Sequence, residues 1–164
     1  MEIQIRRVEP ADFKGVQQVY SQPRAVWGTM QLPFPSEEMW KKRLAESADQ
    51  VYGLVACVEG EVVGHAGLHL TNAAYPRRKH AASLGMAIHD KWQSRGVGTA
   101  LMKALVDLAD KWLNVSRLEL MVYTDNEPAL RLYKKFGFEV EGTLRKHTFR
   151  DGVYVDSYTM ARVR

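Results

Sequence analysis

Two glycines, Gly96 and Gly98, stand close together where an apolar strand-like segment passes into an apolar-striped helix. The turn as a whole reads Gln93-Ser94-Arg95-Gly96-Val97-Gly98-Thr99-Ala100. Glycines leave the backbone bare, and the first N–H groups of a helix have no partner within the helix, so several of them can converge on one anion. The positive end of the helix dipole strengthens that attraction. The turn therefore predicts a site for a pyrophosphate.

Three phosphate-binding patterns contain closely spaced glycines, and the neighbouring residues separate them. A Walker loop carries a lysine before its Ser or Thr, and Gly98-Thr99 lacks one. A dinucleotide-binding turn needs a third glycine where Leu101 stands, and its acid, Glu119, would fall in the middle of a strand. The third pattern, Gln/Arg-x-x-Gly-x-Gly/Ala, is matched by Gln93, Arg95, Gly96 and Gly98. Taken alone, the glycine spacing is also typical of an ordinary tight turn.

A second motif occupies a later helix-like segment and reads Asn126-x-x-Ala129-x-x-x-Tyr133-x-x-Phe136-Gly137-Phe138. Asn126 is a good N-cap, Pro128 is tolerated in the first turn, and Gly137 can close the helix at its C-terminus. The phenol of Tyr133 can donate a proton to a leaving group. Its spacing is equally typical of an aromatic residue in the core.

The elements that must position these residues alternate between strand and helix periodicities. In chain order we predict a strand, two helices, three strands, a helix, a strand, a helix and two strands, which is an α/β (α+β) sandwich with a mixed sheet. Residues 24–35 are expected to be irregular. The predicted elements are a strand at Ile3 and Ile5, a helix opened by Pro10, a helix capped by Ser36, a hairpin of strands 52–58 and 61–70 around Glu59-Gly60, a strand at 82–88, a helix at 97–112, a strand at 117–123, and a final hairpin turning at 150–153.

Two histidines lie on the strand predicted at 61–70. Strict alternation places Val63, His65, Gly67 and His69 on one face, and Val62, Gly64, Ala66, Leu68 and Leu70 on the other. Residues four apart on a strand are about 13 Å apart, so His65 and His69 cannot share a metal ion, and we predict no metal site. His65 could accept a proton or line a pocket, or serve as a hydrogen-bonded structural residue.

The segment predicted to be irregular is unusually apolar. It contains Trp27, Met30, Leu32 and Phe34. It could be a loop folded onto the core or the wall of a pocket for an acceptor substrate.

Composition limits the class of protein. With 164 residues, 46% hydrophobic and 26% charged, residues 1–164 are expected to form one globular domain. No signal peptide or membrane span is predicted, and the lone Cys57 favours a reducing cytoplasm. The net charge of +4 is spread over the chain apart from Arg77-Arg78-Lys79-His80, a cluster that suits a solvated turn or an anionic ligand. No nucleic-acid motif accompanies it, and we predict no nucleic-acid partner.

Together and in this order, the two motifs resemble the GCN5-related N-acetyltransferases, and the likeness covers nearly the whole chain. The resemblance implies a mixed central sheet of about seven strands flanked by about four helices. A branch of small-molecule amine acetyltransferases is suggested by Gly142-Thr143-Leu144-Arg145-Lys146 and by Asp151-Gly152-x-Tyr154-x-Asp156. Similarity to bacterial L-amino acid N-acetyltransferases rests on Gln31-Leu32-Pro33, Pro35-Ser36-x-x-Met39-Trp40 and Val62-Val63-Gly64-His65.

The resemblance also implies roles. Acetyl-CoA would be the co-substrate. The acceptor would be a small primary amine, with a free L-amino acid as the specific candidate. The protein would be a homodimer. Tyr133 would be the general acid facing the thioester sulfur. The cofactor-binding residues implied are Met86, Ala87, Ile88, Gln93, Ser94, Arg95, Gly96, Val97, Gly98, Thr99, Asn126, Ala129 and Tyr133. The acceptor-binding candidates are Trp27, Leu32, Phe34 and His65.

Acetyl transfer to an amine requires several groups whatever the family of the enzyme. The amine must be uncharged before it attacks, the carbonyl oxygen gains negative charge that an N–H near Ala87 or Ile88 could stabilise, and the leaving thiolate needs a proton. The base stays open, because Ser83 stands where many family members have a carboxylate. The remaining candidates are His65, His69, Glu119 and bulk water.

Two other functions compete with the leading one. A protein N-terminal acetyltransferase would share the fold but need an open cleft. A module that binds acyl-CoA without turnover would need no base.

Overall fold

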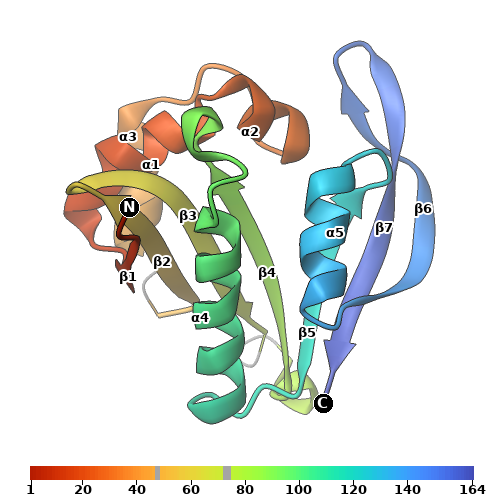
Figure 1. Ribbon diagram of the computed structural model, residues 1–164. Helices are drawn as coiled ribbons and strands as arrows, with labels where there is room; N and C mark the ends of the chain where they lie inside the picture. Colours follow the sequence, from red (N-terminus) through yellow and green to blue (C-terminus); the bar gives the residue numbers. More distant parts are fainter. Residues whose placement is uncertain (47–48, 72–74) are drawn as a thin grey trace.

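A seven-stranded mixed sheet forms the centre of the molecule in the computed structural model, which describes residues 1–46, 49–71 and 75–164 (Figure 1). Its strand order is β1-β2-β3-β4-β5-β7-β6, and β4 and β5 are parallel whereas the other neighbours are antiparallel. The predicted mixed sheet of about seven strands is confirmed. The strands are β1 Gln4–Arg7, β2 Val51–Val58, β3 Glu61–Leu70, β4 Ala81–Ile88, β5 Arg117–Tyr123, β6 Glu139–Arg150 and β7 Val153–Val163.

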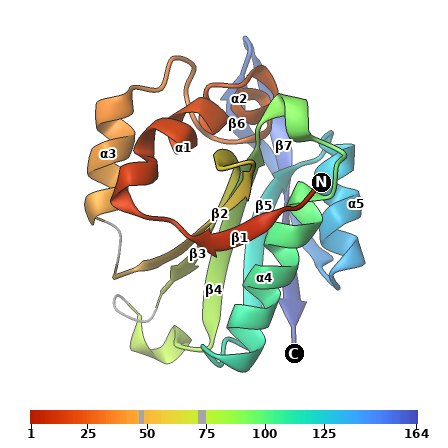
Figure 2. The ribbon, with the colours of Figure 1, turned by 60° about the vertical axis from the view of Figure 1, so that its left-hand side comes forward.

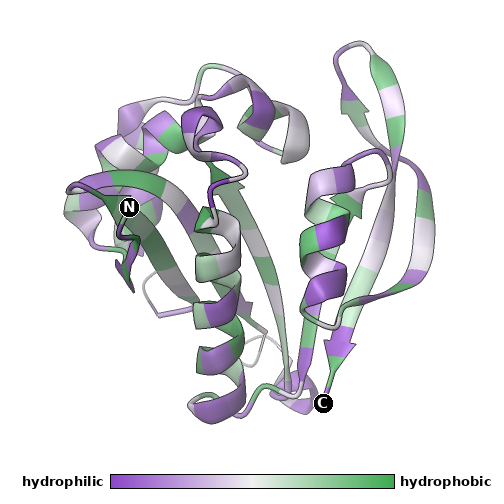
Figure 3. Ribbon diagram, in the orientation of Figure 1, coloured by the Kyte–Doolittle hydropathy of each residue, from purple (hydrophilic) through white to green (hydrophobic). Residues whose placement is uncertain are grey.

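Helices cover both faces of the sheet (Figure 2). Helices α1 (Phe13–Tyr20), α2 (Pro23–Gly28) and α3 (Glu37–Glu46) lie on one side. Helices α4 (Val97–Lys111) and α5 (Glu127–Lys135) lie on the other side. Each side has its own core, because the buried residues of α4 and α5 pack on one sheet face and those of α1 and α3 on the other. Figure 3 shows the resulting pattern, with hydrophobic residues along the central strands and hydrophilic ones on the outer turns of α4 and α5.

Helix α2 corrects the prediction that residues 24–35 are irregular. It begins at Pro23, which suits the first helical position, and Thr29 closes it by donating its N–H to the Ala25 carbonyl at 3.0 Å. Six residues are too few to display a helical period, and the nearby Gly28, Pro33 and Pro35 suggest a loop. The chain therefore has five α-helices within its described residues, one more than the resemblance implied.

A β-bulge corrects the predicted faces of strand β3. Ala56 pairs with Gly64 but Cys57 pairs with Val62, so Val63 is an extra residue without a partner in the register. Val63 consequently packs with the core under α4, whereas Val62 packs against α1. Beyond the bulge the predicted alternation holds, and His65, Gly67 and His69 face the α1–α3 side.

Local signals position the second motif well. The Asn126 side chain accepts the Ala129 N–H at 3.4 Å and caps α5. At the other end, Gly137 has a φ of 86°, and the N–H groups of Phe138 and Gly137 donate to the carbonyls of Tyr133 and Lys134 at 3.1 Å each. This arrangement is a Schellman motif, and it fixes the last turn of α5, which carries Tyr133.

Within the described residues no helix is long and apolar enough to cross a membrane. Cys57 is buried in β2, as expected for a small apolar residue. The cytoplasmic location and the homodimer stay predictions.

Candidate active site

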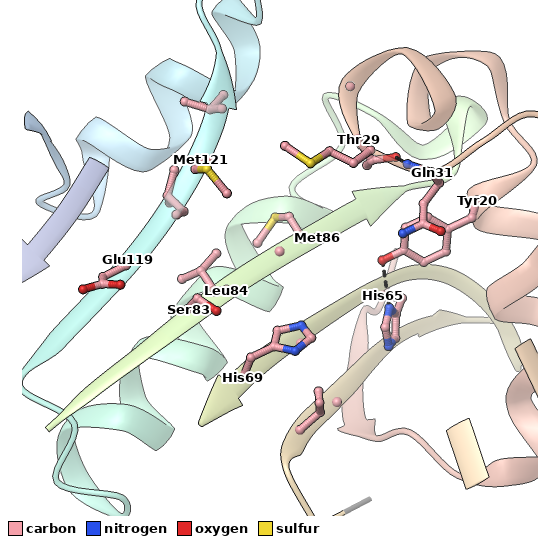
Figure 4. A pocket seen from close by; sticks show the side chains of 18 of the residues that line it. Tyr20, Thr29, Gln31, His65, His69, Ser83, Leu84, Met86, Glu119 and Met121 are labelled. Carbon is pink, nitrogen blue, oxygen red and sulfur yellow. Dashed lines mark hydrogen bonds between the residues drawn. The ribbon is translucent and has the colours of Figure 1, made fainter. Parts of the chain in front are cut away.

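The central feature is a gap in the sheet between β4 and β5. The two strands pair only from Ala81 to Ser83 and from Arg117 to Glu119, after which they diverge, as Figures 1 and 4 show. A cavity of about 900 Å³ occupies this region. Tyr20 and Trp40 line it from one side of the sheet and Tyr133 lines it from the other, so the cavity passes through the sheet.

The unpaired stretch of β4 is an open strand edge. In a strand, alternate peptide groups face each neighbour, so those of residues 84–88 that point toward β5 have no ladder partner there. Met86, Ala87 and Ile88 lie in this stretch, and Met86 lines the cavity. The edge can therefore bind an amide-containing chain as an added strand would.

The glycine turn lies just beyond the end of β4. Gly96 adopts a φ of 87°, a conformation that favours glycine, and Ser94 also has a positive φ of 59°. The first helical hydrogen bond joins the Ala100 N–H to the Gly96 carbonyl at 2.9 Å, so the N–H groups of Val97, Gly98 and Thr99 precede it. Three such amides at the start of a fifteen-residue helix form a site suited to an anion such as a pyrophosphate.

The second glycine of the turn lies against helix α5. A Cβ at Gly98 would lie 3.3 Å from the Cδ2 atom of Leu132 on α5, which is tighter than most such contacts. Helix α5 therefore lies beside the first turn of α4, and the residue next to Leu132 is Tyr133. The turn and the phenol, which are far apart in the sequence, belong to one region of the structure.

Side chains around the turn tie it to its neighbours. Gln93 donates to the Ile88 carbonyl at 3.5 Å and accepts from the Arg24 guanidinium at 3.2 Å. The Arg95 guanidinium lies over the Trp92 ring, 5.2 Å from its centroid. The side chains of Gln93 and Arg95 therefore hold the turn against its neighbours.

Tyr133 is the predicted phenol, and the structure places it in the wall of the cavity. Its side chain is buried, its ring packs against Phe138 with centroids 5.9 Å apart, and its hydroxyl makes no hydrogen bond to the part of the chain that the structure describes. Burial raises the pKa of Tyr133 to about 12. The hydroxyl therefore keeps its proton throughout the physiological pH range.

The floor of the cavity on the α1–α3 side is built from glycines. Gly53, Gly67 and Gly85 are direct neighbours on β2, β3 and β4. Val8 fills the space above Gly53, since a Cβ there would lie 2.5 Å from the Cγ1 atom of Val8. A Cβ at Gly85 would meet nothing within 4 Å, so this part of the floor is open.

Replacing Gly85 with valine should narrow the cavity without unfolding the protein. The side chain would project into open space, and valine suits a strand. We expect an unchanged melting temperature and a roughly tenfold or greater fall in kcat/KM for the larger acceptors, in line with the 1–3 kcal/mol that small changes in pocket shape cost. Gly67→Ala is the contrasting variant, because its Cβ would lie 3.2 Å from the Cγ1 atom of Val51 and should lower the melting temperature. Equal activity of Gly85→Val on all acceptors would contradict this view of the floor.

A buried aromatic cluster closes one end of the cavity. Tyr20 and Trp40 stack with ring centroids 4.5 Å apart, and the Tyr20 hydroxyl is hydrogen-bonded to Nδ1 of His65 at 3.0 Å (Figure 4). Burial lowers the pKa of His65 to about 4 and raises the pKa of Tyr20. His65 is consequently neutral at pH 7, with one ring nitrogen already engaged.

The neutral state of His65 predicts a loss of stability in acid. Its pKa is near 4 in the folded protein against 6.5 unperturbed, so between these values the unfolded chain binds more protons. The resulting contribution to the free energy of unfolding is fully present above pH 6.5 and is lost as the pH falls to about 4; at 1.36 kcal/mol per pKa unit it amounts to about 3 kcal/mol. Urea denaturation across this range should show a steeper fall for the wild type than for His65→Gln. His80→Gln, at an exposed position, is the control, and equal slopes for all three proteins would refute the prediction.

The other base candidates lie in one row across the sheet. His69 is opposite Ser83 on β4, and Ser83 is opposite Glu119 on β5. Glu119 is ion-paired with Arg78 and with Arg117, whose Nε lies 2.7 Å away. The pKa of His69 is lowered by partial burial, so this side chain is also neutral at pH 7. The row thus contains one neutral imidazole and one carboxylate that is already paired.

Of the four acceptor-binding candidates, only His65 lines the cavity. His65 lines the cavity, but Leu32 and Phe34 are 81% and 99% exposed and lie outside its lining, as does Trp27. The Trp27 ring instead packs under the Arg150 guanidinium, 4.0 Å from its carbon to the ring centroid. The expected pocket wall is formed by Gly28, Thr29, Met30 and Gln31 of the same segment.

Three lining residues were missed as functional candidates. Tyr20 and Trp40 recur with apolar residues at helical spacing, and a helical period cannot distinguish a core position from a cavity wall. Arg43 carried no signal in the sequence. The basic cluster at 77–80 contributes Arg78 to the ion pair with Glu119. No group of three or more His, Cys, Asp or Glu that could hold a metal occurs among the described residues.

Comparisons with known proteins show the family of the chain. Residues 17–138 match the sequence model of the acetyltransferase (GNAT) family. The L-amino acid N-acetyltransferase AaaT of Escherichia coli strain K12 is 45% identical over 163 residues, which cover 99% of each protein.

Solved structures share the fold at lower sequence identity. A phosphinothricin acetyltransferase from Sinorhizobium meliloti in complex with AcCoA superimposes with a TM-score of 0.86 and 22% identity over 99% of this chain and 89% of that one. Spermidine N-acetyltransferase from Vibrio cholerae, in complex with CoA and spermine, gives a TM-score of 0.86 and 20% identity over 98% and 95%.

Proposed function

Since the chain belongs to the GNAT family and is an acetyl-CoA-dependent N-acetyltransferase, we propose that its acceptor is the α-amine of a free L-amino acid. The observation that carries the proposal is the 45% identity to an L-amino acid N-acetyltransferase over 99% of both proteins. The matched region includes the segments that line the cavity as well as the glycine turn.

The enclosure of the cavity favours a small acceptor. The Tyr123 hydroxyl donates to the Thr29 carbonyl at 3.0 Å, and the Arg150 guanidinium lies over the Trp27 ring. Helix α2 and the residue that follows it are therefore in contact with strands β5 and β6. Helices α1 and α3 cover the same face. A protein N-terminus would need an open groove here, and we therefore rank a protein acceptor second.

Acetyl-CoA would occupy both the turn and the open strand edge. The N–H groups of Val97, Gly98 and Thr99 would bind the pyrophosphate, with Gln93, Ser94, Arg95 and Gly96 shaping the turn around them. Met86, Ala87 and Ile88 would form the strand edge that binds the pantetheine amides through those of its peptide groups that face the gap, and Asn126 and Ala129 would border the thiol end. As the co-substrate, acetyl-CoA supplies the activated acetyl group.

Tyr133 would act as the general acid. As the C–N bond to the acetyl carbon forms and the C–S bond breaks, the sulfur leaves as a thiolate and takes the phenolic proton of Tyr133. The amine loses its own proton to His69 of the same cavity or to water, because burial disfavours the charged form of His65 and the Tyr20 hydroxyl already engages its Nδ1 atom. An N–H of the β4 edge stabilises the charge that develops on the carbonyl oxygen.

Release of free thiol from acetyl-CoA, measured with a panel of L-amino acids and with a short peptide bearing a free N-terminus, tests the proposal. We expect release with amino acids and little with the peptide. Preferred turnover of the peptide would replace the proposed acceptor. Coenzyme A binding without thiol release would instead indicate a module that binds acyl-CoA without turnover.

A further inference from the structure

The wall of the cavity carries a guanidinium that the mechanism above does not use. Arg43 of α3 lines the cavity near Gln31, Trp40 and Tyr20. Its Nη1 atom donates to the Gln31 side-chain oxygen at 3.0 Å, and its guanidinium carbon lies 4.7 Å from the centroid of the Trp40 ring. Figure 4 shows Gln31 beside Tyr20 and His65 at the cavity wall. An otherwise exposed side chain is thus held in one place by a hydrogen bond and a ring contact.

The charge of Arg43 is not neutralised by an acid in the part of the chain that the structure describes, in contrast to the charge of Arg117. Arg117, which also lines the cavity, is ion-paired with both Glu119 and Glu141. Arg43 forms no ion pair with any acid in residues 1–46, 49–71 and 75–164. A guanidinium presents several N–H donors in a planar fork. Gln31 accepts from the Nη1 atom, and the only other acceptor for the fork among the described residues is the weakly accepting Met39 sulfur, 3.9 Å from the Nη2 atom.

The charges nearby favour an anion at this end of the cavity. His65 is neutral, and the two acidic residues of the lining, Glu119 and Glu141, are both engaged by Arg117. The positive charge of Arg43 also reaches the Tyr20 hydroxyl, where it opposes the rise in pKa that burial causes. Arg43 is therefore electrostatically coupled to the interior, although its side chain is exposed to solvent.

We infer that Arg43, held by Gln31 and Trp40, binds the carboxylate of the acceptor amino acid. Carboxylates pair with guanidinium groups through two parallel hydrogen bonds, which fix orientation as well as position. In an α-amino acid the carboxylate and the amine share one carbon, so a fixed carboxylate also restricts where the amine lies. The inference rests on the proposed function and names the group that would distinguish an amino acid from a simple amine.

The test compares an amino acid with its own primary amide, which keeps the α-amine and the side chain but lacks the negative charge. Steady-state kinetics are measured for wild type, Arg43→Gln and Arg43→Lys. Arg43→Gln should raise KM for the amino acid roughly 10- to 100-fold, the range expected for a lost hydrogen bond between charged groups, and should change KM for the amide less than about twofold. Arg43→Lys should recover part of the loss. Lys42→Gln removes a neighbouring charge that is 72% exposed and paired with Glu46, and it should change neither KM.

Three results would overturn the inference. Equal effects of Arg43→Gln on the amino acid and on its amide would make Arg43 a structural residue. Wild-type turnover of the amide with the same or a lower KM would exclude recognition of the carboxylate while leaving acetyl transfer to amino-acid amines intact. Absence of thiol release with both compounds would refute the proposed function itself, and the inference with it.

Discussion

Replacement of Gly98 with glutamate is expected to lower the affinity for coenzyme A at least about 100-fold, equivalent to about 2.7 kcal/mol. Two effects combine. The added side chain would start 3.3 Å from Leu132 and so enter the space between the first turn of α4 and α5. Its carboxylate would also bring a negative charge to the amides that are proposed to bind the pyrophosphate. Isothermal titration calorimetry with coenzyme A measures the change.

Loss of binding by Gly98→Glu should not reflect unfolding. A glutamate in the first turn interacts favourably with the helix dipole, and any ordinary residue has a better helix propensity than glycine. Gly98→Ala adds only the crowding and should have a smaller effect. Lys103→Glu changes the charge by an even larger amount at an exposed position of the same helix and should bind coenzyme A nearly as wild type does. Unchanged affinity of Gly98→Glu would remove the turn from the binding site.

The Tyr133→Phe variant is expected to lower kcat by about 100-fold or more, since general acid catalysis contributes roughly 10²–10⁴. The ring and its contact with Phe138 would be retained, and the hydroxyl has no hydrogen-bond partner in the described part of the chain. The melting temperature and the affinity for coenzyme A should therefore change little. Single-turnover kinetics with acetyl-CoA and an amino acid measure the chemical step directly.

A matched control separates the acid from a general effect of removing a hydroxyl. Tyr158 is a half-buried tyrosine of β7 that lies outside the cavity lining, and Tyr158→Phe should keep full activity. The pKa of about 12 adds a second expectation, because Tyr133 stays protonated up to high pH. Below about pH 11, the pH–rate profile of the wild type should therefore contain no decline that is missing from the profile of Tyr133→Phe. Full activity of Tyr133→Phe would refute the assignment.

The features that could be predicted from the sequence are those determined by neighbouring residues. The turns at Glu59-Gly60 and Asp151-Gly152 have positive φ at both positions, as a two-residue hairpin requires. Ser36 accepts the Met39 N–H at 3.0 Å and caps α3 as expected. In each case a few adjacent residues supply both the conformational preference and the hydrogen bonds, so no distant contact is needed to specify the outcome.

The two errors in the fold concern features that a sequence pattern cannot resolve. Helix α2 is shorter than two helical turns and is followed by glycine and proline residues. The bulge places Val63 on the opposite face of the sheet from the one that strict alternation predicts. No unusual residue type marks it in the sequence, because valine is common on both faces of a sheet. Both features depend on how α1 and the segment after α2 pack onto the sheet.

By itself, the sequence determined the order of the elements apart from α2, the glycine turn at the start of α4, the caps of α5 and hence the family. Only the tertiary structure decided which side chains meet. Tyr133 lines the same cavity as Tyr20, Trp40 and Arg43 because β4 and β5 separate after Ser83, and the cavity passes through the sheet at that point. The end of that pairing is set by contacts between distant segments, and helical periodicity marks a residue as inward-facing without saying whether it meets a core or a cavity.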